Sequence, residues 1–177
     1  MSPPVRIRRV ADDAAAPLVP ALARLLIDCV EAGASVSFMH PLGEARAQAF
    51  WRGVAEGVAR HERVLLVAED GDGALVGTVQ VVLALPENQP HRGDVAKLLV
   101  QPGARRQGTA AALMAAADRE ARHEGRTLLV LDTVTGGDAE RLYARLGWQR
   151  CGVIPDFALF PRGGLCSTTV FYKALPA

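Results

Sequence analysis

The sequence carries almost no net charge, contains few cysteines and histidines, and lacks any long apolar run. Its 20 Lys and Arg residues are balanced by 19 Asp and Glu residues, which leaves a formal charge of +1. A chain so close to neutrality has no extended field of one sign, and this excludes the usual means of binding nucleic acid or an anionic membrane. We expect neither as a partner, so any charged ligand must be bound by local groups.

The cysteines and histidines are too scattered for a metal centre. Cys29, Cys151 and Cys166 cannot all pair with one another, and no two have the spacing of a zinc or thioredoxin-type motif. The four histidines lie in separate segments without ligand spacing. We therefore expect reduced thiols and no metal. Because no apolar stretch is long enough for a signal peptide or for the roughly 20 residues of a membrane span, we also expect a cytoplasmic location.

The length of 177 residues predicts a single domain spanning 1–177, without repeats or linkers. Apolar periodicity predicts alternating helices and strands, and hence an α+β fold with a mixed sheet. The helices are expected at 17–31, 43–60, 108–124 and 139–146. The strands are expected at 5–10, 63–68, 74–85, 94–100 and 126–133, with two more within 148–174.

Two connections indicate how four of these strands pair. The strands at 63–68 and 74–85 are joined by a turn with two Asp-Gly steps, which favours a hairpin, so they should be antiparallel neighbours. The strands at 94–100 and 126–133 are separated by the helix at 108–124, so they should be parallel.

The most informative segment runs from Val100 to Ala110, where a buried strand leads into a helix. Such a junction directs unpaired backbone N–H groups and the positive end of the helix toward one place, which favours phosphate binding. Gly108 lets the backbone approach a ligand, and Arg105 and Arg106 supply positive charge. The segment predicts an anion site, although an ordinary Pro/Gly loop with solvated arginines has the same features.

The sequence does not contain either of two other phosphate-binding motifs in complete form. Gly103 and Gly108 have the Walker A spacing, and the apolar run that ends at Asp132 resembles a Walker B strand. Thr109, however, stands where that motif requires lysine, so no ammonium would reach the terminal phosphates of a nucleotide. The Gly-x-Gly-x-x-Gly turn of dinucleotide-binding oxidoreductases is also missing from the sequence.

The same segment carries a family signature. It contains Arg105-x-x-Gly108-x-Ala110, preceded by Val100-x-Pro102. In these residues the chain resembles the GCN5-related N-acetyltransferase (GNAT) family, whose signature Arg/Gln-x-x-Gly-x-Gly/Ala begins a helix after a central strand. The position of the motif between a predicted strand and a predicted helix agrees with this resemblance.

A second GNAT hallmark lies downstream. Ala139-x-x-x-Tyr143, on a short predicted helix, is followed by Gly147 and Trp148, and the order and spacing of both motifs match the family over nearly the whole chain. The chain looks most like the tabtoxin resistance protein branch of the family, which implies acetylation of a small toxin and a role in resistance. The similar segments are 33–39, 97–100, 131–133 and 171–175.

The resemblance implies a GNAT fold, with a mixed central sheet of roughly six to seven strands and about four helices. In this fold the parallel central strands splay apart around acetyl coenzyme A (acetyl-CoA). The pantetheine chain is then expected to pair with the backbone at Leu98, Leu99 and Val100. The pyrophosphate is expected on the amides of Arg105, Arg106, Gln107, Gly108, Thr109 and Ala110.

Attack on the acetyl group requires a neutral amine. An ammonium with a pKa of about 10 is only ~0.1% neutral near pH 7, so a proton acceptor or a desolvating pocket must help. The candidate bases are Asp94, at the start of the strand that leads to the phosphate loop, and Asp132, at the end of its parallel neighbour. Both carboxylates could instead be structural, or could bind the substrate's ammonium without taking its proton.

Tyr143 is placed by the second motif to reach the coenzyme A sulfur and to give a proton to the departing thiolate, with packing on the sheet as the alternative. Many GNAT members have Asn three residues before the motif alanine, where this chain has Gly136. A side-chain contact to the cofactor is then either missing or made by Thr135 or Asp138.

These features predict an acetyl-CoA-dependent N-acetyltransferase that acetylates a primary amine in a ternary complex, without a covalent enzyme intermediate. A small toxin-like, antibiotic-like or amino-acid-like acceptor is expected, and a zwitterion would use Asp94 or Asp132 for its amine and an arginine for its carboxylate. The alternatives are a non-catalytic acyl-CoA-binding sensor or partner-binding module, a protein N-terminal or lysine acetyltransferase, and a degenerate nucleotide hydrolase. The chain is expected to be a monomer or a homodimer. The expected acceptor residues are Ser35, Phe38, Met39 and His91.

Overall fold

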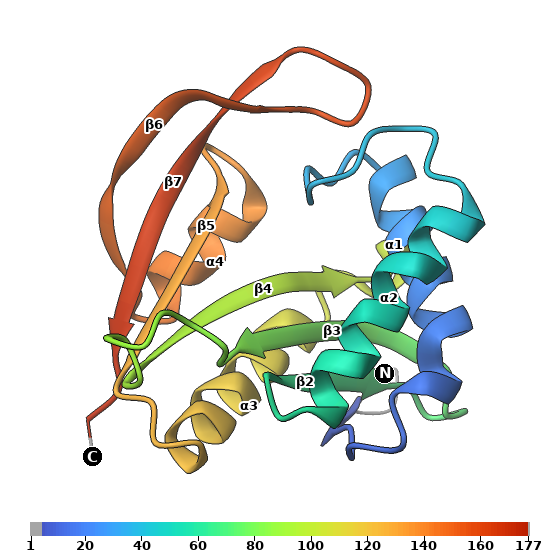
Figure 1. The fold of residues 1–177 in the computed structure, drawn as a ribbon. Coiled ribbons are helices and arrows are strands. Elements are labelled where there is room, and N and C mark those ends of the chain that lie inside the picture. The colour runs from blue at the N-terminus through green and yellow to red at the C-terminus, as the bar shows by residue number, and fades with distance from the viewer. Residues whose placement is uncertain (1–4, 177) are drawn as a thin grey trace.

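The strands form one mixed sheet with helices on both faces. The structure, a computed structural model, describes residues 5–176, and its seven strands lie in the order β1-β2-β3-β4-β5-β7-β6 (Figure 1). The strands are β1 (Arg6–Arg9), β2 (Arg63–Glu69), β3 (Leu75–Val82), β4 (Arg92–Val100), β5 (Leu128–Val134), β6 (Gln149–Leu159) and β7 (Leu165–Ala174). The helices are α1 (Val19–Glu31), α2 (Glu44–Ala59), α3 (Thr109–His123) and α4 (Asp138–Arg145). Within residues 5–176, none of the helices has the length and apolarity that a membrane span requires.

The α+β fold expected from the sequence is confirmed, with seven strands and four α-helices. β2 and β3 are antiparallel neighbours, and β4 and β5 are parallel, as predicted. Some bounds differ from the prediction. The helix expected at 17–31 begins as a 3-10 turn, Ala16–Leu18, and α1 follows with Pro20 in its first turn, where a missing N–H costs no helical bond. β4 begins at Arg92 because the backbone from this residue already pairs with β5.

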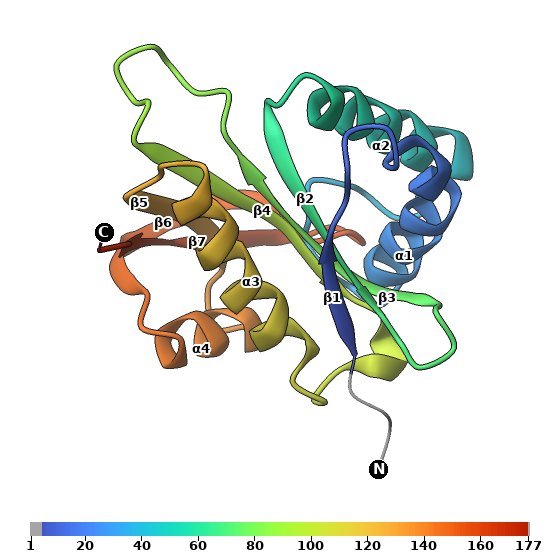
Figure 2. The ribbon, with the colours of Figure 1, turned by 90° about the horizontal axis from the view of Figure 1, so that it is seen from below.

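α1 and α2 cover one face of the sheet, and α3 and α4 cover the other (Figure 2). The buried side of α3 consists of Leu113 and Met114 among alanines, so the helix can lie close to the strands. Gly77 on β3 makes the approach still closer, because an added Cβ would lie 3.0 Å from Leu113 Cδ1 and 3.1 Å from the Leu99 carbonyl. The start of α3 is thereby held against β3 and β4.

β4 and β5 separate partway along their length, and this separation positions the candidate site. Their pairing is restricted to Arg92–Asp94 on β4 and Leu128–Val130 on β5. Beyond these residues β5 pairs with β7, and the three strands β5, β7 and β6 rise away from β4 in Figure 1. β4 also changes its register against β3 between Thr78 and Gln80, where Lys97 has a φ of +54°. Such a bulge adds one residue to a strand and increases its local twist.

We expect Gly77→Ala to destabilise the fold by about 1–3 kcal/mol, because its methyl group would press on Leu113 and on the Leu99 carbonyl. Gly53→Ala is the matched control, since Gly53 lies on the exposed side of α2 with nothing within 4 Å of an added Cβ. Alanine at this helical position should stabilise by about 0.5–1 kcal/mol. Urea unfolding measures both variants, and equal stability would contradict the close approach of α3 to the sheet.

Candidate active site

The edge of β4 that faces β5 has no strand partner after Asp94. The Gln101 N–H donates to the Val76 carbonyl of β3 at 2.8 Å. Because the N–H and C=O groups of successive strand residues alternate in direction, those of Val100 point to the opposite side, toward the gap. The Val100 carbonyl accepts from the Cys29 thiol at 3.5 Å and from Arg105 Nε at 3.3 Å. The Val100 N–H is left for a ligand that lies in the gap.

The loop after β4 enters α3 through a 3-10 turn, Pro102–Ala104, and two residues with left-handed backbone. Arg106 has a φ of +61°, and Gly108, the N-cap of α3, has a φ of +84°. A Cβ at Gly108 would meet nothing within 4 Å, so the space beside the helix start is open. The first N–H groups of α3, from Thr109 onward, have no acceptor within the helix. Together with the positive end of the helix they form an anion-binding backbone.

Around this helix start, one buried hydroxyl has no hydrogen-bond partner and two guanidinium groups have no ion-pair partner among the described residues. The Thr109 hydroxyl is buried and has no hydrogen-bond partner among the described residues. Arg105 and Arg106 are exposed, and neither forms an ion pair within residues 5–176. Gln107 donates to the Gly103 carbonyl at 3.4 Å, which folds the loop onto itself. The loop therefore offers backbone donors and two guanidinium groups to an anion.

These groups fit the coenzyme A that the sequence resemblance implies. A diphosphate requires hydrogen-bond donors and positive charge, and both surround Gly108. The amides of a pantetheine chain require a free strand edge, which β4 supplies at Val100. Strand edge and helix start are joined by only a short loop, so one extended ligand can contact both.

The two candidate carboxylates have different partners. Asp94 forms an ion pair with Arg92 and lies beside Val130, at the last paired position of β4 and β5. Asp132 lies two residues further along β5, is exposed, and accepts a hydrogen bond from the Thr168 hydroxyl at 2.7 Å. Strand alternation places both carboxylates on the face covered by α1 and α2. Asp94 is already paired with a guanidinium, whereas Asp132 has no cationic partner in the part of the chain that the structure describes.

Tyr143 is buried on α4, where its ring packs against Trp148 and Phe171 with centroid distances of 5.9 and 6.0 Å. Burial raises the pKa of its phenol above the ordinary value of about 10, and the negative charge of Asp132 raises it further. The phenol is therefore protonated throughout the neutral and mildly alkaline range.

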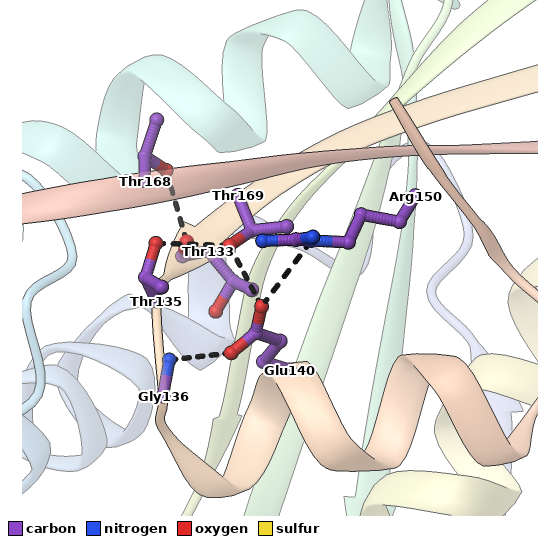
Figure 3. A network of polar contacts seen from close by, with 7 residues as sticks. All are labelled: Thr133, Thr135, Gly136, Glu140, Arg150, Thr168 and Thr169. Carbon is purple, nitrogen blue, oxygen red and sulfur yellow. Dashed lines mark hydrogen bonds and ion pairs between the residues drawn. The ribbon is translucent and has the colours of Figure 1, made fainter. Parts of the chain in front are cut away.

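A hydrogen-bond network around Glu140 fixes α4 to the turn after β5 and to the middle of β7 (Figure 3). The Gly136 N–H and the Thr169 hydroxyl both donate to the Glu140 carboxylate, the latter at 2.8 Å, and these two bonds lower the pKa of Glu140. Arg150 Nε lies 3.9 Å from the same carboxylate. Because Glu140 precedes Tyr143 by one helical turn, the network also fixes the part of α4 that carries Tyr143.

Gly136 stands where the resemblance leads us to expect an asparagine, and it offers no contact to the cofactor in its place. Its φ of +82° turns the chain from β5 into α4, and its N–H is occupied by Glu140. Thr135 Oγ1 lies 2.9 Å from the Thr169 hydroxyl, and Asp138 pairs with Arg141, so both expected substitutes have protein partners. A glutamate at the third position of a helix often accepts a hydrogen bond from a backbone N–H at the helix start. This pattern is the sequence signal that could have identified Glu140.

The loop between α1 and α2 meets the tip of the β6–β7 hairpin (Figure 1). Ser35 donates to the Leu159 carbonyl at 3.1 Å, and the His40 N–H donates to the Pro161 carbonyl at 2.8 Å. Ser35, expected to bind the acceptor, therefore joins the loop to the hairpin. These contacts close one side of the space above the gap between β4 and β5.

The other expected acceptor residues lie in different places. Phe38 is half-buried and packs edge to face on Phe50 of α2, with a centroid distance of 5.3 Å. Met39 is 40% exposed in the same loop. His91 precedes β4 at the end opposite the gap, about 20 Å from Lys97 at the usual rise of a strand. The structure thus brings Phe38 and Met39 to the loop beside the gap but does not bring His91 there.

Lys97 lies beside the gap, although the sequence analysis gives it no role of its own. Its Nζ lies 3.2 Å from Ser37 Oγ and 5.7 Å from the centroid of the Phe50 ring, so the side chain reaches from β4 to the α1–α2 side of the gap. Burial lowers the pKa of its ammonium, and the charge of Asp132 offsets part of this effect. The bulge that turns Lys97 in this direction arises from the way β4 pairs with β3. This pairing cannot be seen in the sequence around Lys97.

Two surface cavities lie elsewhere on the molecule. One, of about 410 Å³, is lined by residues of α1 and of the β2–β3 turn, among them Asp28. The other, of about 560 Å³, is lined by residues of α1 and α2, among them Arg52. Neither is lined by Asp132, Tyr143 or the helix start at Gly108, so the candidate site is defined by a strand edge and a loop rather than by either cavity.

Comparison with solved structures shows that the fold is shared with acetyltransferases. An N-acetyltransferase from Staphylococcus aureus Mu50 is 16% identical with a TM-score of 0.79, and the match covers 98% of this chain and 99% of that one. The ribosomal-protein-alanine N-acetyltransferase from Brucella melitensis is 22% identical with a TM-score of 0.77, covering 96% and 99%. The protein yncA from Salmonella typhimurium, solved with its cofactor acetyl-CoA, is 16% identical with a TM-score of 0.77, covering 98% and 95%.

Sequence comparison identifies the family. An uncharacterized N-acetyltransferase from the hisH-hisA intergenic region of Azospirillum brasilense is 33% identical over 107 residues. The match covers 59% of this chain and 61% of that protein, so the chain spans less than two thirds of the relative's length. The model of the acetyltransferase (GNAT) domain matches residues 61–150, a range that contains β4, the helix start at Gly108, and Tyr143. With this match, the fold and the two sequence motifs in agreement, the chain belongs to the GNAT acetyltransferase family.

Proposed function

We propose that the protein transfers the acetyl group of acetyl-CoA to a primary amine of a small molecule, by direct attack in a ternary complex. The observation that carries this proposal is the continuity between the free β4 edge at Val100 and the open helix start at Gly108. Family membership and the acetyl-CoA bound by the fold neighbour yncA support the choice of this thioester.

Two parts of the chain would hold the cofactor. The β4 edge from Leu98 to Val100 would pair with the pantetheine amides, and the backbone N–H groups from Gln107 to Ala110 would bind the pyrophosphate. Arg105 and Arg106, which have no carboxylate partner within residues 5–176, would offset the phosphate charge. The chain as a whole has almost no net charge, but these two arginines would place positive charge where the phosphates lie.

Asp132 and Tyr143 would act closest to the reacting atoms. Acetyl-CoA supplies an acetyl group activated as a thioester. Asp132 would accept, directly or through a water, the proton that the ammonium must lose before its nitrogen attacks the carbonyl carbon. As the C–N bond forms and the C–S bond breaks, Tyr143 would donate a hydrogen bond to the sulfur that leaves as a thiolate. The second proton that the nitrogen loses on becoming an amide would pass through water to that thiolate or to the solvent.

The raised pKa of Tyr143 favours hydrogen bonding over full proton transfer. A thiol has an ordinary pKa of about 8.5, whereas burial raises the phenol above about 10. Transfer of the proton from the phenol to the thiolate is therefore unfavourable at equilibrium. A donated hydrogen bond still stabilises the developing negative charge, and it requires no later reprotonation of the phenol.

A small acceptor agrees with the enclosure of the α1–α2 side. The contacts of Ser35 with Leu159 and of His40 with Pro161 restrict this side of the gap. The resemblance to the tabtoxin resistance branch supports a toxin-like or amino-acid-like amine, and hence a role in resistance. The ribosomal protein acceptor in the name of the Brucella neighbour shows that the same fold also serves a protein substrate, at 22% identity.

The proposed function is tested by titration calorimetry with acetyl-CoA, ATP and NAD, followed by thiol detection with a panel of primary amines. We expect binding of acetyl-CoA alone among the three, and release of free thiol that depends on both acetyl-CoA and amine. Binding of ATP without acetyl-CoA would overturn the proposal. Binding of acetyl-CoA without thiol release by any amine would instead identify an acyl-CoA sensor.

The helix start can be tested with two glycines at opposite ends of α3. Gly108→Ala and Gly125→Ala both place a methyl group in open space at a left-handed position, with φ of +84° and +72°. Each should lose about 1 kcal/mol of stability through backbone strain. Only Gly108→Ala should weaken acetyl-CoA binding, by about tenfold or more, because its methyl group lies beside the phosphate donors. Calorimetric dissociation constants that change equally in both variants would contradict the anion site.

The role of Tyr143 can be separated from packing by removing only its hydroxyl. Tyr143→Phe should lower kcat by about 10²-fold or more, by analogy with the loss of a charge-stabilising donor, while leaving the fold intact. Because the raised pKa keeps the phenol protonated, the loss should be the same from neutral to mildly alkaline pH. Tyr172→Phe, on β7, is the control and should retain activity. Steady-state kinetics across pH would contradict this role if the two variants behaved alike.

The two carboxylates are distinguished by their partners. Asp132→Asn should lower kcat/KM by about tenfold or more, corresponding to at least about 1.4 kcal/mol of barrier. Asp94→Asn should cause a smaller loss, because that carboxylate already pairs with Arg92. Asp132→Asn should also lower the pKa of Tyr143, since the charge that raises it is gone, and ultraviolet titration in a Tyr172→Phe background measures this shift. The opposite order of the two losses would assign the base to Asp94.

A further inference from the structure

Lys97 owes its direction to the β4 bulge. Val95 and Leu98 pack with the core beneath α3, and Leu99 packs with the core beneath α1 and α2. Regular alternation from Val95 would direct Ala96 toward α1 and α2 and Lys97 toward α3. The extra residue, with Lys97 at a φ of +54°, instead turns Lys97 toward α1 and α2. A bulge next to a reaction site is a common means of redirecting one side chain.

The ammonium of Lys97 forms no ion pair within residues 5–176. It contacts the Ser37 hydroxyl at 3.2 Å and lies 5.7 Å from the centroid of the Phe50 ring. The residue is half-buried, and this burial lowers its pKa. A partly desolvated cation with only a hydroxyl and a ring face is a site for an anion.

Asp132 provides an opposite charge in the same region. Asp132 and Lys97 lie on the same face of the sheet, each just past the residues at which β4 and β5 stop pairing. The charge of Asp132 raises the pKa of both Lys97 and Tyr143, which agrees with this placement. Asp132 and Lys97 do not form an ion pair, although they have opposite charges on the same face of the sheet. A molecule that carries an ammonium and a carboxylate a few bonds apart would complement both groups.

Two arginines near the gap already have partners within the protein. Arg92 pairs with Asp94, and Arg162 donates to the Glu31 carbonyl at 3.3 Å and lies 3.1 Å from the His40 ring. The sequence-based expectation that an arginine binds the carboxylate of a zwitterionic acceptor therefore has a better candidate in Lys97.

We propose that Lys97 and Asp132 are the two poles of an acceptor subsite for an amino-acid-type amine, with Lys97 binding the acceptor's carboxylate. The proposal rests on the proposed function and adds to it the chemical class of the acceptor. The ammonium of the acceptor lies on the Asp132 side, next to Tyr143. The carboxylate lies on the Lys97 side, where Ser37 adds a hydroxyl donor.

The test compares matched acceptors that differ only in the carboxylate. A panel of α-amino acids covering each side-chain class is assayed by thiol release beside the α-amides of the same amino acids. The wild-type protein should prefer the best acid over its amide by about tenfold or more in kcat/KM, the usual size of a charge-assisted hydrogen bond. Lys97→Met should remove this preference by raising KM for the acid, without changing the dissociation constant of acetyl-CoA. Lys97→Arg should restore part of it.

Arg52→Met is the control for loss of a positive charge, because Arg52 lies on the exposed side of α2 and contacts only Gln48 among the described residues. It should keep the preference for the acid. Thiol release with amides equal to or faster than with acids would overturn the subsite while leaving the acetyltransferase function in place. An equal fall of kcat on acid and amide in Lys97→Met would also overturn it, because that result assigns Lys97 to the chemical step. Failure to bind acetyl-CoA would overturn the proposed function and this subsite together.

Discussion

The parting of β4 from β5 is the constraint on which the rest of the site depends. Two parallel strands that stay paired satisfy each other's backbone groups and leave none for a ligand. Here the pairing ends at Asp94, and the Val100 N–H faces a gap. A hydrogen bond between this N–H and a ligand amide would contribute about 0.5–1.5 kcal/mol, the usual net contribution of a hydrogen bond. The strand edge therefore both creates the site and favours a ligand that can act as a further strand.

The charged side chains of the candidate site lie in two separate places. Exposed guanidinium groups gather at the start of α3, at Arg105 and Arg106, where phosphates would lie. Lys97 and Asp132 lie on the other side of the gap, toward α1 and α2, where an acceptor would enter. A chain with a net charge of only +1 cannot attract a charged ligand by its overall field. It can still bind two charged molecules, because each charge is placed a short distance from its partner.

Local patterns predict most of the fold and the cofactor side of the site, but not the acceptor side. The helix start at Gly108 and the position of Tyr143 depend on nearby residues, so motif and periodicity locate them well. The pairing of Asp94 with Arg92 was missed because the strand was expected to begin at Asp94, although residues two apart on a strand share a face. The bulge at Lys97 depends on the register against β3, which is not a local property.

The turn before α4 explains why a glycine is acceptable where many relatives have asparagine. At Gly136 a φ of +82° lets the chain bend so that its N–H meets Glu140, and the same carboxylate binds the Thr169 hydroxyl of β7. These bonds close the turn from within, so its backbone donor is not available to coenzyme A. Cofactor binding must then depend more heavily on the segment from β4 to α3. The same bonds of Glu140 hold α4 against the sheet, together with Tyr143, which lies one helical turn further on.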